Sequence, residues 1–229
     1  MKDFSRLGIR VKDGVMTLNG RPYHGVGVNF FPALSLCLDR VVYGDTRTDV
    51  EDYIRKLSEA GIPCMRVMFG VFYGEYVHLW AEKEKRAKYH EACDLLVSLA
   101  EKYRIGIIAS LFWNVNAFCD YVGDELDLIA DPESRSTKLR LEYVSDIVGR
   151  YRFSPAIWAW EIGNELNLAC EMTDTEFTTS KGERNPFLTE YLTGYYKIIG
   201  RAVREIDPYR MLTGGDAAPR TNSMALYRS

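Results

Sequence analysis

The sequence of 229 residues has no excess of positive charge, few histidines and no closely spaced cysteines. Its formal net charge at pH 7 is -3, whereas proteins that bind nucleic acid normally carry a surplus of Lys and Arg, so no nucleic-acid partner is expected. The three histidines are scattered and no Cys-x-x-Cys pair occurs, so neither a metal nor a cofactor is predicted. A neutral ligand is compatible with this composition.

The cysteines and the apolar segments indicate the cellular setting. The cysteines are odd in number and widely spaced, which does not suggest a disulfide framework. The first six residues lack the long apolar region of a signal peptide, and no apolar run approaches the length of a membrane span. These features favour a cytoplasmic protein with no membrane partner. The cysteines are Cys37, Cys64, Cys93, Cys119 and Cys170.

Strand-like apolar segments alternate with longer amphipathic segments. Asp-Gly and Asn-Gly dipeptides predict a hairpin over residues 8–20, because they supply the positive φ of tight turns. The alternation predicts an α/β fold with a parallel sheet, either closed as a barrel or open as a doubly wound sheet. Polar residues at strand ends, and the lack of a complete Gly-x-Gly-x-x-Gly turn after the first strand, favour a TIM-type (β/α)8 barrel in one domain over residues 1–229. The predicted strands cover 23–29, 63–69, 105–112, part of 158–167, and 210–213.

Sequence signals also mark where helices begin. Thr48 and Glu51 have the spacing of a capping box. Asp-Pro at 131–132 and Asn-Pro at 185–186 each place an N-cap residue before a proline at the first helical position. A long amphipathic helix is predicted over about residues 82–103. These helices are expected to cover the outside of the parallel sheet.

Residues 158–167 read Trp-Ala-Trp-Glu-Ile-Gly-Asn-Glu-Leu-Asn, an apolar strand that ends in Gly-Asn-Glu. A buried strand has no structural need to finish on a carboxylic acid, and desolvating one beside tryptophans costs free energy. Apolar surroundings favour the protonated form of a carboxyl group, so Glu165 could donate a proton to a leaving group. The alternative is a surface carboxylate in the loop after the strand. Asn164 and Glu165 can both face a cleft only if the strand bulges or ends near Gly163.

This segment resembles the strand-four motif of clan A glycoside hydrolases, and most closely that of family 5 cellulases and mannanases, which ends in Asn-Glu. The resemblance extends from residues 18–22 and 25–29 to the fifth predicted strand. It implies a retaining glycoside hydrolase whose substrate is an oligo- or polysaccharide with β-linkages, of the mannan or glucan type. By this resemblance, Glu165 is the acid/base and Asn164 positions the 2-hydroxyl group of the sugar.

The resemblance also assigns roles to residues outside this segment. Arg66 on the second strand would orient a catalytic carboxylate, and the alternative is a structural ion pair. Asn29 at the end of the first strand would line the cleft, and the alternative is an Asn that caps a turn. Trp113 and Asn114 are candidate substrate-binding residues, and the alternatives are an aromatic that anchors a loop and a turn former. Glu161 is expected to point into the barrel as a structural hydrogen-bonding group.

The third strand departs from the common pattern of the family. Many family 5 members end this strand with a His beside an aromatic residue, whereas residues 111–116 here read Leu-Phe-Trp-Asn-Val-Asn. This end is closer to mannanase-like than to cellulase-like branches.

The predicted strands are five, whereas a closed barrel of this type has eight. The resemblance places the nucleophilic Glu at the end of strand seven, and residues 217–229 contain no carboxylate side chain. We therefore expect an incomplete barrel that lacks its C-terminal strands. Its first and fifth strands would be open edges that favour self-association. The alternative function is a non-catalytic glycan-binding or truncated relative without the nucleophile.

Overall fold

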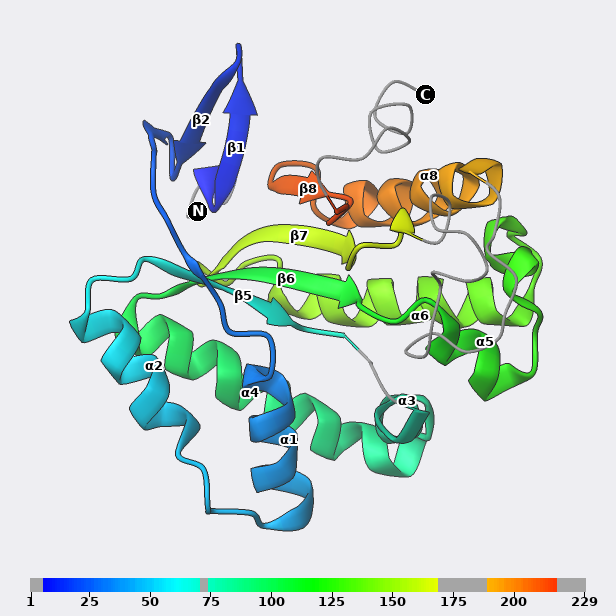
Figure 1. Ribbon diagram of the computed structural model, residues 1–229, viewed down its shortest axis with the longest axis horizontal. Helices are drawn as coiled ribbons and strands as arrows, with labels where there is room; N and C mark the ends of the chain where they lie inside the picture. Colours follow the sequence, from blue (N-terminus) through cyan, green and yellow to red (C-terminus); the bar gives the residue numbers. More distant parts are fainter. Residues whose placement is uncertain (1–5, 71–73, 169–188, 218–229) are drawn as a thin grey trace.

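The computed structural model describes residues 6–70, 74–168 and 189–217. Its largest sheet is parallel, and the order of the strands in space follows their order in the sequence (Figure 1). Parallel neighbours need a crossover connection, and helices lie in the connections between them. The α/β fold with five parallel strands is therefore confirmed. The strands are β4 (Val28–Asn29), β5 (Cys64–Met68), β6 (Gly106–Phe112), β7 (Ile157–Gly163) and β8 (Met211–Thr213).

Helices pack along the sheet and cover it. Helix α1 lies against β5, α4 against β6 and α8 against β7 (Figure 1). The long helix predicted over about 82–103 corresponds to α4. The described helices are α1 (Ala33–Tyr43), α2 (Val50–Glu59), α3 (Gly74–Ala81), α4 (Lys83–Tyr103), α5 (Asn116–Val122), the 3₁₀-helix η2 (Leu126–Ala130), α6 (Arg135–Tyr151) and α8 (Thr189–Ile206).

The main apolar core lies between the sheet and these helices. Strand β7 is buried along its whole length, and the side chain of Trp160 is fully buried. A strand that is covered on both faces reads as a continuous apolar run, which explains the composition of this segment. Helix α8 buries Leu192, Tyr195, Ile199 and Val203, whose spacing of three and four residues places them on one face.

The predicted start of α2 is wrong by one residue. The helix is capped by Asp49, whose side chain accepts hydrogen bonds from the backbone N–H groups of Glu51 at 3.1 Å and Asp52 at 3.3 Å. Thr48 precedes this cap, so the expected capping box with Glu51 does not form. An Asp at the N-cap accepts hydrogen bonds from the same unpaired N–H groups. Its negative charge also interacts favourably with the positive end of the helix dipole.

The predicted start of α6 is also wrong. Ser134 caps this helix and accepts a hydrogen bond from the N–H of Thr137 at 3.1 Å. Asp131 begins the preceding turn instead, where its carboxylate accepts from the N–H of Glu133 at 2.9 Å. Both positions carry a side chain suited to capping, and local sequence alone did not separate them. The predicted start at 185–186 lies outside the described residues.

The first parallel strand is much shorter than predicted. Of the strand predicted over residues 23–29, only the last two residues, which form β4, pair with β5. Residues 23–27 lie outside the sheet. Gly27 passes close to the start of β5, where an added Cβ atom would lie 2.5 Å from the Sγ atom of Cys64. The apolar pattern of this segment did not distinguish a paired strand from an extended connection.

The N-terminal residues form a separate antiparallel sheet of β1 (Ile9–Lys12), β2 (Val15–Leu18) and β3 (Arg21–Pro22). The turns at Asp13-Gly14 and Asn19-Gly20 have positive φ values between 52° and 81°, as the dipeptides predict. Gly8 also has a positive φ, and its Cβ would meet the backbone oxygen of Trp158 at 2.6 Å. The hairpin can therefore lie against the start of β7 only with glycine at this position.

A buried ion pair lies just before the start of β8, and both of its residues form hydrogen bonds to β7. Arg210 and Asp207 are 2% and 3% exposed, and their Nη1 and Oδ2 atoms lie 2.6 Å apart. Asp207 also accepts a hydrogen bond from the indole N–H of Trp160 at 2.9 Å. Burial alone would raise the pKa of Asp207, but the Trp160 hydrogen bond and the Arg210 charge outweigh it and lower the pKa. The guanidinium of Arg210 also donates to the carbonyl groups of Arg152, Ser154 and Ile157.

Strands β4 and β8 are the two edges of the parallel sheet, as expected. Self-association through these edges stays a prediction. Among the residues that the structure describes, no helix is long and apolar enough to cross a membrane. The four described cysteines are buried free thiols, and Cys170 lies outside the described residues.

We predict that Asp207→Ala lowers the free energy of unfolding by about 3–5 kcal/mol, because Arg210 is left buried without a counter-charge. Urea denaturation measures this loss. The matched control is Asp127→Ala at an exposed position, which should change stability by no more than about 0.5 kcal/mol. A loss no larger than that of the control would contradict the proposed role of the ion pair.

The same ion pair predicts a pH dependence. The pKa of Asp207 is lower in the folded protein than in the unfolded chain, so its stabilising contribution is present above the unfolded value of about 4. This contribution is lost as the pH falls through the folded value. The stability difference between the wild type and Asp207→Ala should therefore shrink below about pH 4.

Candidate active site

Polar side chains gather where the parallel strands end. The register of the sheet aligns Asn29 of β4 with Arg66 of β5, and Glu161 of β7 with Thr213 of β8. Glu161 is also aligned with Ser110 of β6, so the group spans the whole sheet. Parallel strands bring their carboxyl ends to one edge, where barrels of this type build their sites.

Arg66 connects two of the predicted site residues. Its Nε atom lies 3.0 Å from both carboxylate oxygens of Glu161, and its Nη2 atom lies 2.7 Å from Oε1. Nη2 also donates to the amide oxygen of Asn164 at 2.9 Å. Glu161 is only 4% exposed, and a carboxylate at this depth needs a charged partner. The structural ion pair considered for Arg66 is therefore present, and the same guanidinium orients Asn164.

This arrangement leaves one end of the Asn164 amide available. Its oxygen accepts from Arg66, so its NH₂ group is the part that can donate to a ligand hydroxyl. Glu161 has the structural hydrogen-bonding role that its strand position predicts. The carboxylate that Arg66 holds among the described residues is Glu161.

Strand β7 ends at Gly163, and the backbone then turns sharply. Glu165 has a positive φ of 51°, and its N–H donates to the carbonyl oxygen of Gly215 at 2.8 Å. The N–H of Gly163 donates to Gly214 at 3.2 Å, so the loop after β8 supports the whole turn. The positive φ breaks the strand alternation that would place Asn164 and Glu165 on opposite faces. Left-handed backbone at a residue other than glycine is uncommon and occurs often at functional sites.

The tryptophans of the motif do not form a wall around Glu165, and this expectation is wrong. The side chain of Glu165 is exposed. Trp160 is fully buried and bonds to Asp207 on the far side of the strand. Trp158 is packed edge-on against Tyr23, with ring centroids 5.6 Å apart. Successive residues of a strand face opposite sides. The presence of tryptophans near Glu165 in the sequence therefore did not show whether their rings lie on the same side as its carboxyl group.

Trp113 lies directly over the Arg66 guanidinium, at 4.5 Å from the ring centroid. Phe31 also stacks on Trp113, with centroids 6.0 Å apart and an interplanar angle of 29°. Phe31 is 46% exposed, and it is a site residue that the sequence motifs did not predict. The available signal was its position two residues beyond Asn29, at the end of the first strand. These contacts make Trp113 an aromatic part of the site.

The remaining predicted residues are placed differently. The side chain of Asn29 is exposed beside the strand position of Arg66. Asn114 accepts a hydrogen bond from the N–H of Asn116 at 3.0 Å, which matches the turn-former alternative. A fourth asparagine, Asn167, was not predicted. It exchanges two hydrogen bonds with the backbone of Ala217, at 2.8 and 3.1 Å, and joins the loops after β7 and β8.

The carboxylates near this edge are held in different ways. Glu161 is bound by Arg66, and Asp216 accepts a hydrogen bond from the Tyr196 hydroxyl at 2.6 Å. Residues 6–70, 74–168 and 189–217 contain no group of three His, Cys, Asp or Glu side chains arranged to hold a metal ion. The chemistry available in this part of the chain is that of a carboxyl group, an amide and an aromatic surface.

Comparison with characterised proteins decides the family likeness. No sequence profile of a known family matches the chain. A probable mannan endo-1,4-beta-mannosidase F of Aspergillus flavus is 29% identical over 131 residues, and a probable mannan endo-1,4-beta-mannosidase C of Aspergillus terreus is 23% identical over 242 residues. The chain resembles the family 5 glycoside hydrolases of clan A.

A solved structure shows the likeness of fold. The family 5 mannosidase of Rhizomucor miehei, solved with mannosyl-fructose, has a TM-score of 0.61 and 14% sequence identity, over 94% of this chain and 57% of that chain. The five parallel strands therefore belong to the TIM-type barrel fold, which they do not close. The alignments cover 54% and 86% of this chain but only 24% and 52% of the two Aspergillus relatives.

We predict that Gly215→Ala destabilises the turn that supports Glu165. A Cβ at this position would lie 2.0 Å from the Gly163 carbonyl oxygen and 2.7 Å from the Glu161 carboxyl carbon, at a φ of 75°. Urea denaturation should show a loss of about 1–3 kcal/mol or more.

Gly149→Ala is the matched control for this substitution. Nothing lies within 4 Å of the Cβ that it would add in helix α6. Alanine favours helix by up to about 1 kcal/mol, so the control should be neutral or stabilising. Equal effects of the two substitutions would show that the close approach at Gly215 does not constrain the turn.

Proposed function

We propose that the protein is a retaining glycoside hydrolase that acts on β-linked glycans, with Glu165 as its acid/base. In this proposal Asn164 donates a hydrogen bond to a sugar hydroxyl next to the scissile bond. Arg66 and Glu161 hold Asn164 in place without taking part in bond breaking. The likeness to mannan-degrading enzymes supports a mannan-type substrate, with a glucan-type substrate as the second possibility.

The observation that carries the proposal is the bond from Arg66 to Asn164, directly before Glu165. An amide with one end bound to a buried ion pair has little rotational freedom, so its NH₂ group is preorganised for a ligand. The neighbouring carboxyl group is exposed and can reach a glycosidic oxygen or a water molecule. A retaining acid/base needs both, because it first protonates the leaving group and then activates water.

A retaining mechanism also needs a nucleophilic carboxylate about 5–5.5 Å from the acid/base. The family likeness places this carboxylate on the seventh strand of the parallel barrel, beyond the five parallel strands described, so we assign the nucleophile to neither Glu161 nor Asp216. The proposal therefore requires a carboxylate from outside the described residues. The competing function is a glycan-binding protein that keeps Asn164 and Trp113 but does not hydrolyse its ligand.

Sugar binding is assigned to the aromatic surface of Trp113 and Phe31. Trp113 lies over Arg66 at the edge where Asn164 is held, and Phe31 stacks on Trp113. Rings that are partly exposed and rigidly stacked present a flat apolar face, which suits the apolar face of a pyranose. This role does not depend on turnover and is shared by the two candidate functions.

The acid role predicts how Glu165→Gln depends on the leaving group. In the intact protein, kcat/KM should fall by about 100- to 10,000-fold for oligosaccharides, which need protonation of a poor leaving group. Activated aryl glycosides should lose much less, because their leaving groups depart without a proton. Glu133→Gln, at an exposed position before α6, is the matched control and should leave both rates unchanged. Equal losses on both substrates would count against the acid role.

The binding role predicts a fluorescence response from one tryptophan. Trp80, Trp158 and Trp160 are at most 9% exposed, whereas Trp113 is partly exposed at the site. Titration with manno- and cello-oligosaccharides should therefore give a saturable change in tryptophan emission. Trp113→Ala should abolish most of this change and weaken binding measured by calorimetry, while Trp158→Phe should preserve both. A full response in Trp113→Ala would remove this residue from the site.

A further inference from the structure

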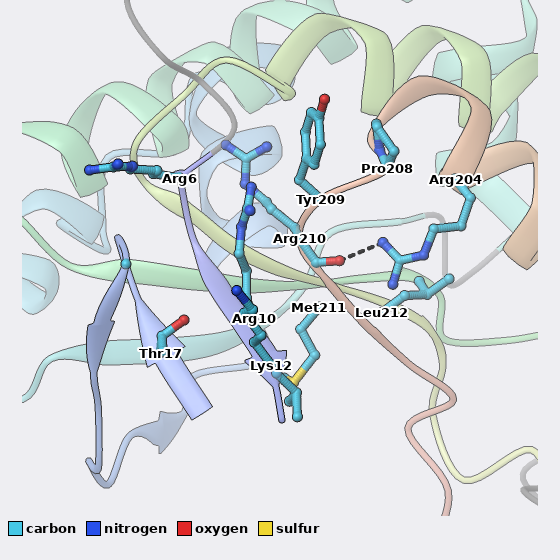
Figure 2. Close-up of a pocket in the computed structure, with 12 residues that line it drawn as sticks. Arg6, Arg10, Lys12, Thr17, Arg204, Pro208, Tyr209, Arg210, Met211 and Leu212 are labelled. Atoms are coloured by element: carbon cyan, nitrogen blue, oxygen red, sulfur yellow. Dashed lines mark hydrogen bonds between the residues drawn. The ribbon is translucent and has the colours of Figure 1, made fainter. Parts of the chain in front are cut away.

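A pocket lies at the opposite end of β8 from the candidate active site, between the N-terminal hairpin and the start of the strand (Figure 2). Its volume is about 860 Å³. No acidic side chain is among the twelve residues that line it, although the protein as a whole has a net charge of -3. Its cationic lining residues are Arg6, Arg10, Lys12, Arg204 and Arg210.

Two of these arginines are already used by the fold. Arg210 is bound to the Asp207 carboxylate and to backbone carbonyl groups. Arg204 donates to the carbonyl oxygens of Asp207 at 3.3 Å and Arg210 at 2.5 Å, and Figure 2 shows the second of these bonds. These side chains form the rigid wall of the pocket and add positive potential to it.

Arg10 is different, because part of its guanidinium has no partner. Its Nε and Nη2 atoms are both buried from solvent and make no hydrogen bond. The guanidinium lies over the ring of Tyr209, with Cζ 5.0 Å from the centroid, which restricts its orientation. A guanidinium stays protonated, so it cannot avoid this desolvation by losing its charge. Its charge is also repelled by that of Arg210, whose pKa is lowered by burial and, to a smaller extent, by this repulsion.

An oxyanion in the pocket would offset the repulsion between Arg10 and Arg210. A guanidinium is also the side-chain cation that pairs best with carboxylate and phosphate groups. The exposed ammonium group of Lys12 lies on the same strand and lines the same pocket. The concave shape favours a small ligand over an extended nucleic-acid backbone, and the net negative charge of the protein points the same way.

We propose that this pocket is a binding site for a small molecule that carries a phosphate or carboxylate group, with Arg10 as its main cationic partner and Lys12 at its rim. The site is separate from the proposed glycosidase site, since the two lie at opposite ends of β8. Binding there would also join the hairpin to the start of β8.

The test is isothermal titration of the intact protein with inorganic phosphate and, in a separate arm, with citrate, both at low ionic strength. We expect saturable binding of at least one of them, weakened by added sodium chloride. Arg10→Gln should weaken this binding by about tenfold or more, because it removes a charge-assisted contact. Lys12→Gln should weaken it by about threefold, as expected for an exposed charge. A preference for phosphate or for citrate identifies which oxyanion the pocket favours.

Arg47→Gln is the matched control, because it removes the same charge from an exposed loop remote from the pocket. It should leave the affinity within about twofold of the wild type, since its charge is screened by solvent. If Arg10→Gln fails to fold, the comparison of Lys12→Gln with Arg47→Gln decides the matter. Absence of binding, or equal losses in pocket and control variants, overturns the proposal. Concentration-dependent dimerisation that requires Arg10, without anion binding, would overturn it in favour of a second copy of the chain.

Discussion

The ion pair between Arg66 and Glu161 is the interaction on which the candidate active site depends. It joins β5 to β7 across β6, and it gives the buried carboxylate of Glu161 a counter-charge. Because the guanidinium has a donor to spare after binding Glu161, it also holds Asn164. The ring of Trp113 packs on the flat face of this guanidinium. One buried charge pair therefore positions the amide and the aromatic surface assigned to sugar binding.

The loop after β8 completes this arrangement from the other side. Gly215 passes so close to Glu161 and Gly163 that no side chain fits there, and its carbonyl oxygen holds the N–H of Glu165. Asn167 and Ala217 join the same two loops a few residues further on. The position of Glu165 therefore depends on β8 being correctly paired with β7. That pairing is supported just before β8, where the ion-paired Arg210 and Asp207 bond to Ile157 and Trp160 of β7.

The two ends of β8 have different electrostatic characters. At its carboxyl end, the charge of Arg66 is balanced by Glu161 and the neighbouring groups are neutral or acidic. At its start, Asp207 forms an ion pair with Arg210, and the other cationic groups line a pocket that has no acidic side chain in its lining. A neutral glycan suits the first end, and an oxyanion suits the second. The net charge of the chain, which is slightly negative, reveals neither of these local fields.

Much of the fold could be predicted, because its signals are periodic and local. The alternation of apolar strands and amphipathic helices predicted five parallel strands, and the Asp-Gly and Asn-Gly dipeptides predicted the hairpin turns. The ends of elements were less accurate: Asp49 and Ser134 cap helices that Thr48 and Asp131 were expected to begin. Neighbouring residues with similar capping groups compete, and packing decides between them.

The sequence by itself predicted five strands in a parallel sheet and the structural hydrogen-bonding role of Glu161, since each follows from residue type and periodicity. It left open whether β7 bulges or ends near Gly163. Only the tertiary structure decided the partners across the sheet: that Arg66 binds both Glu161 and Asn164, and that Phe31 stacks on Trp113. It also turned the motif tryptophans away from Glu165. These contacts join residues up to about one hundred positions apart, and local pattern carries no information on which distant side chains meet.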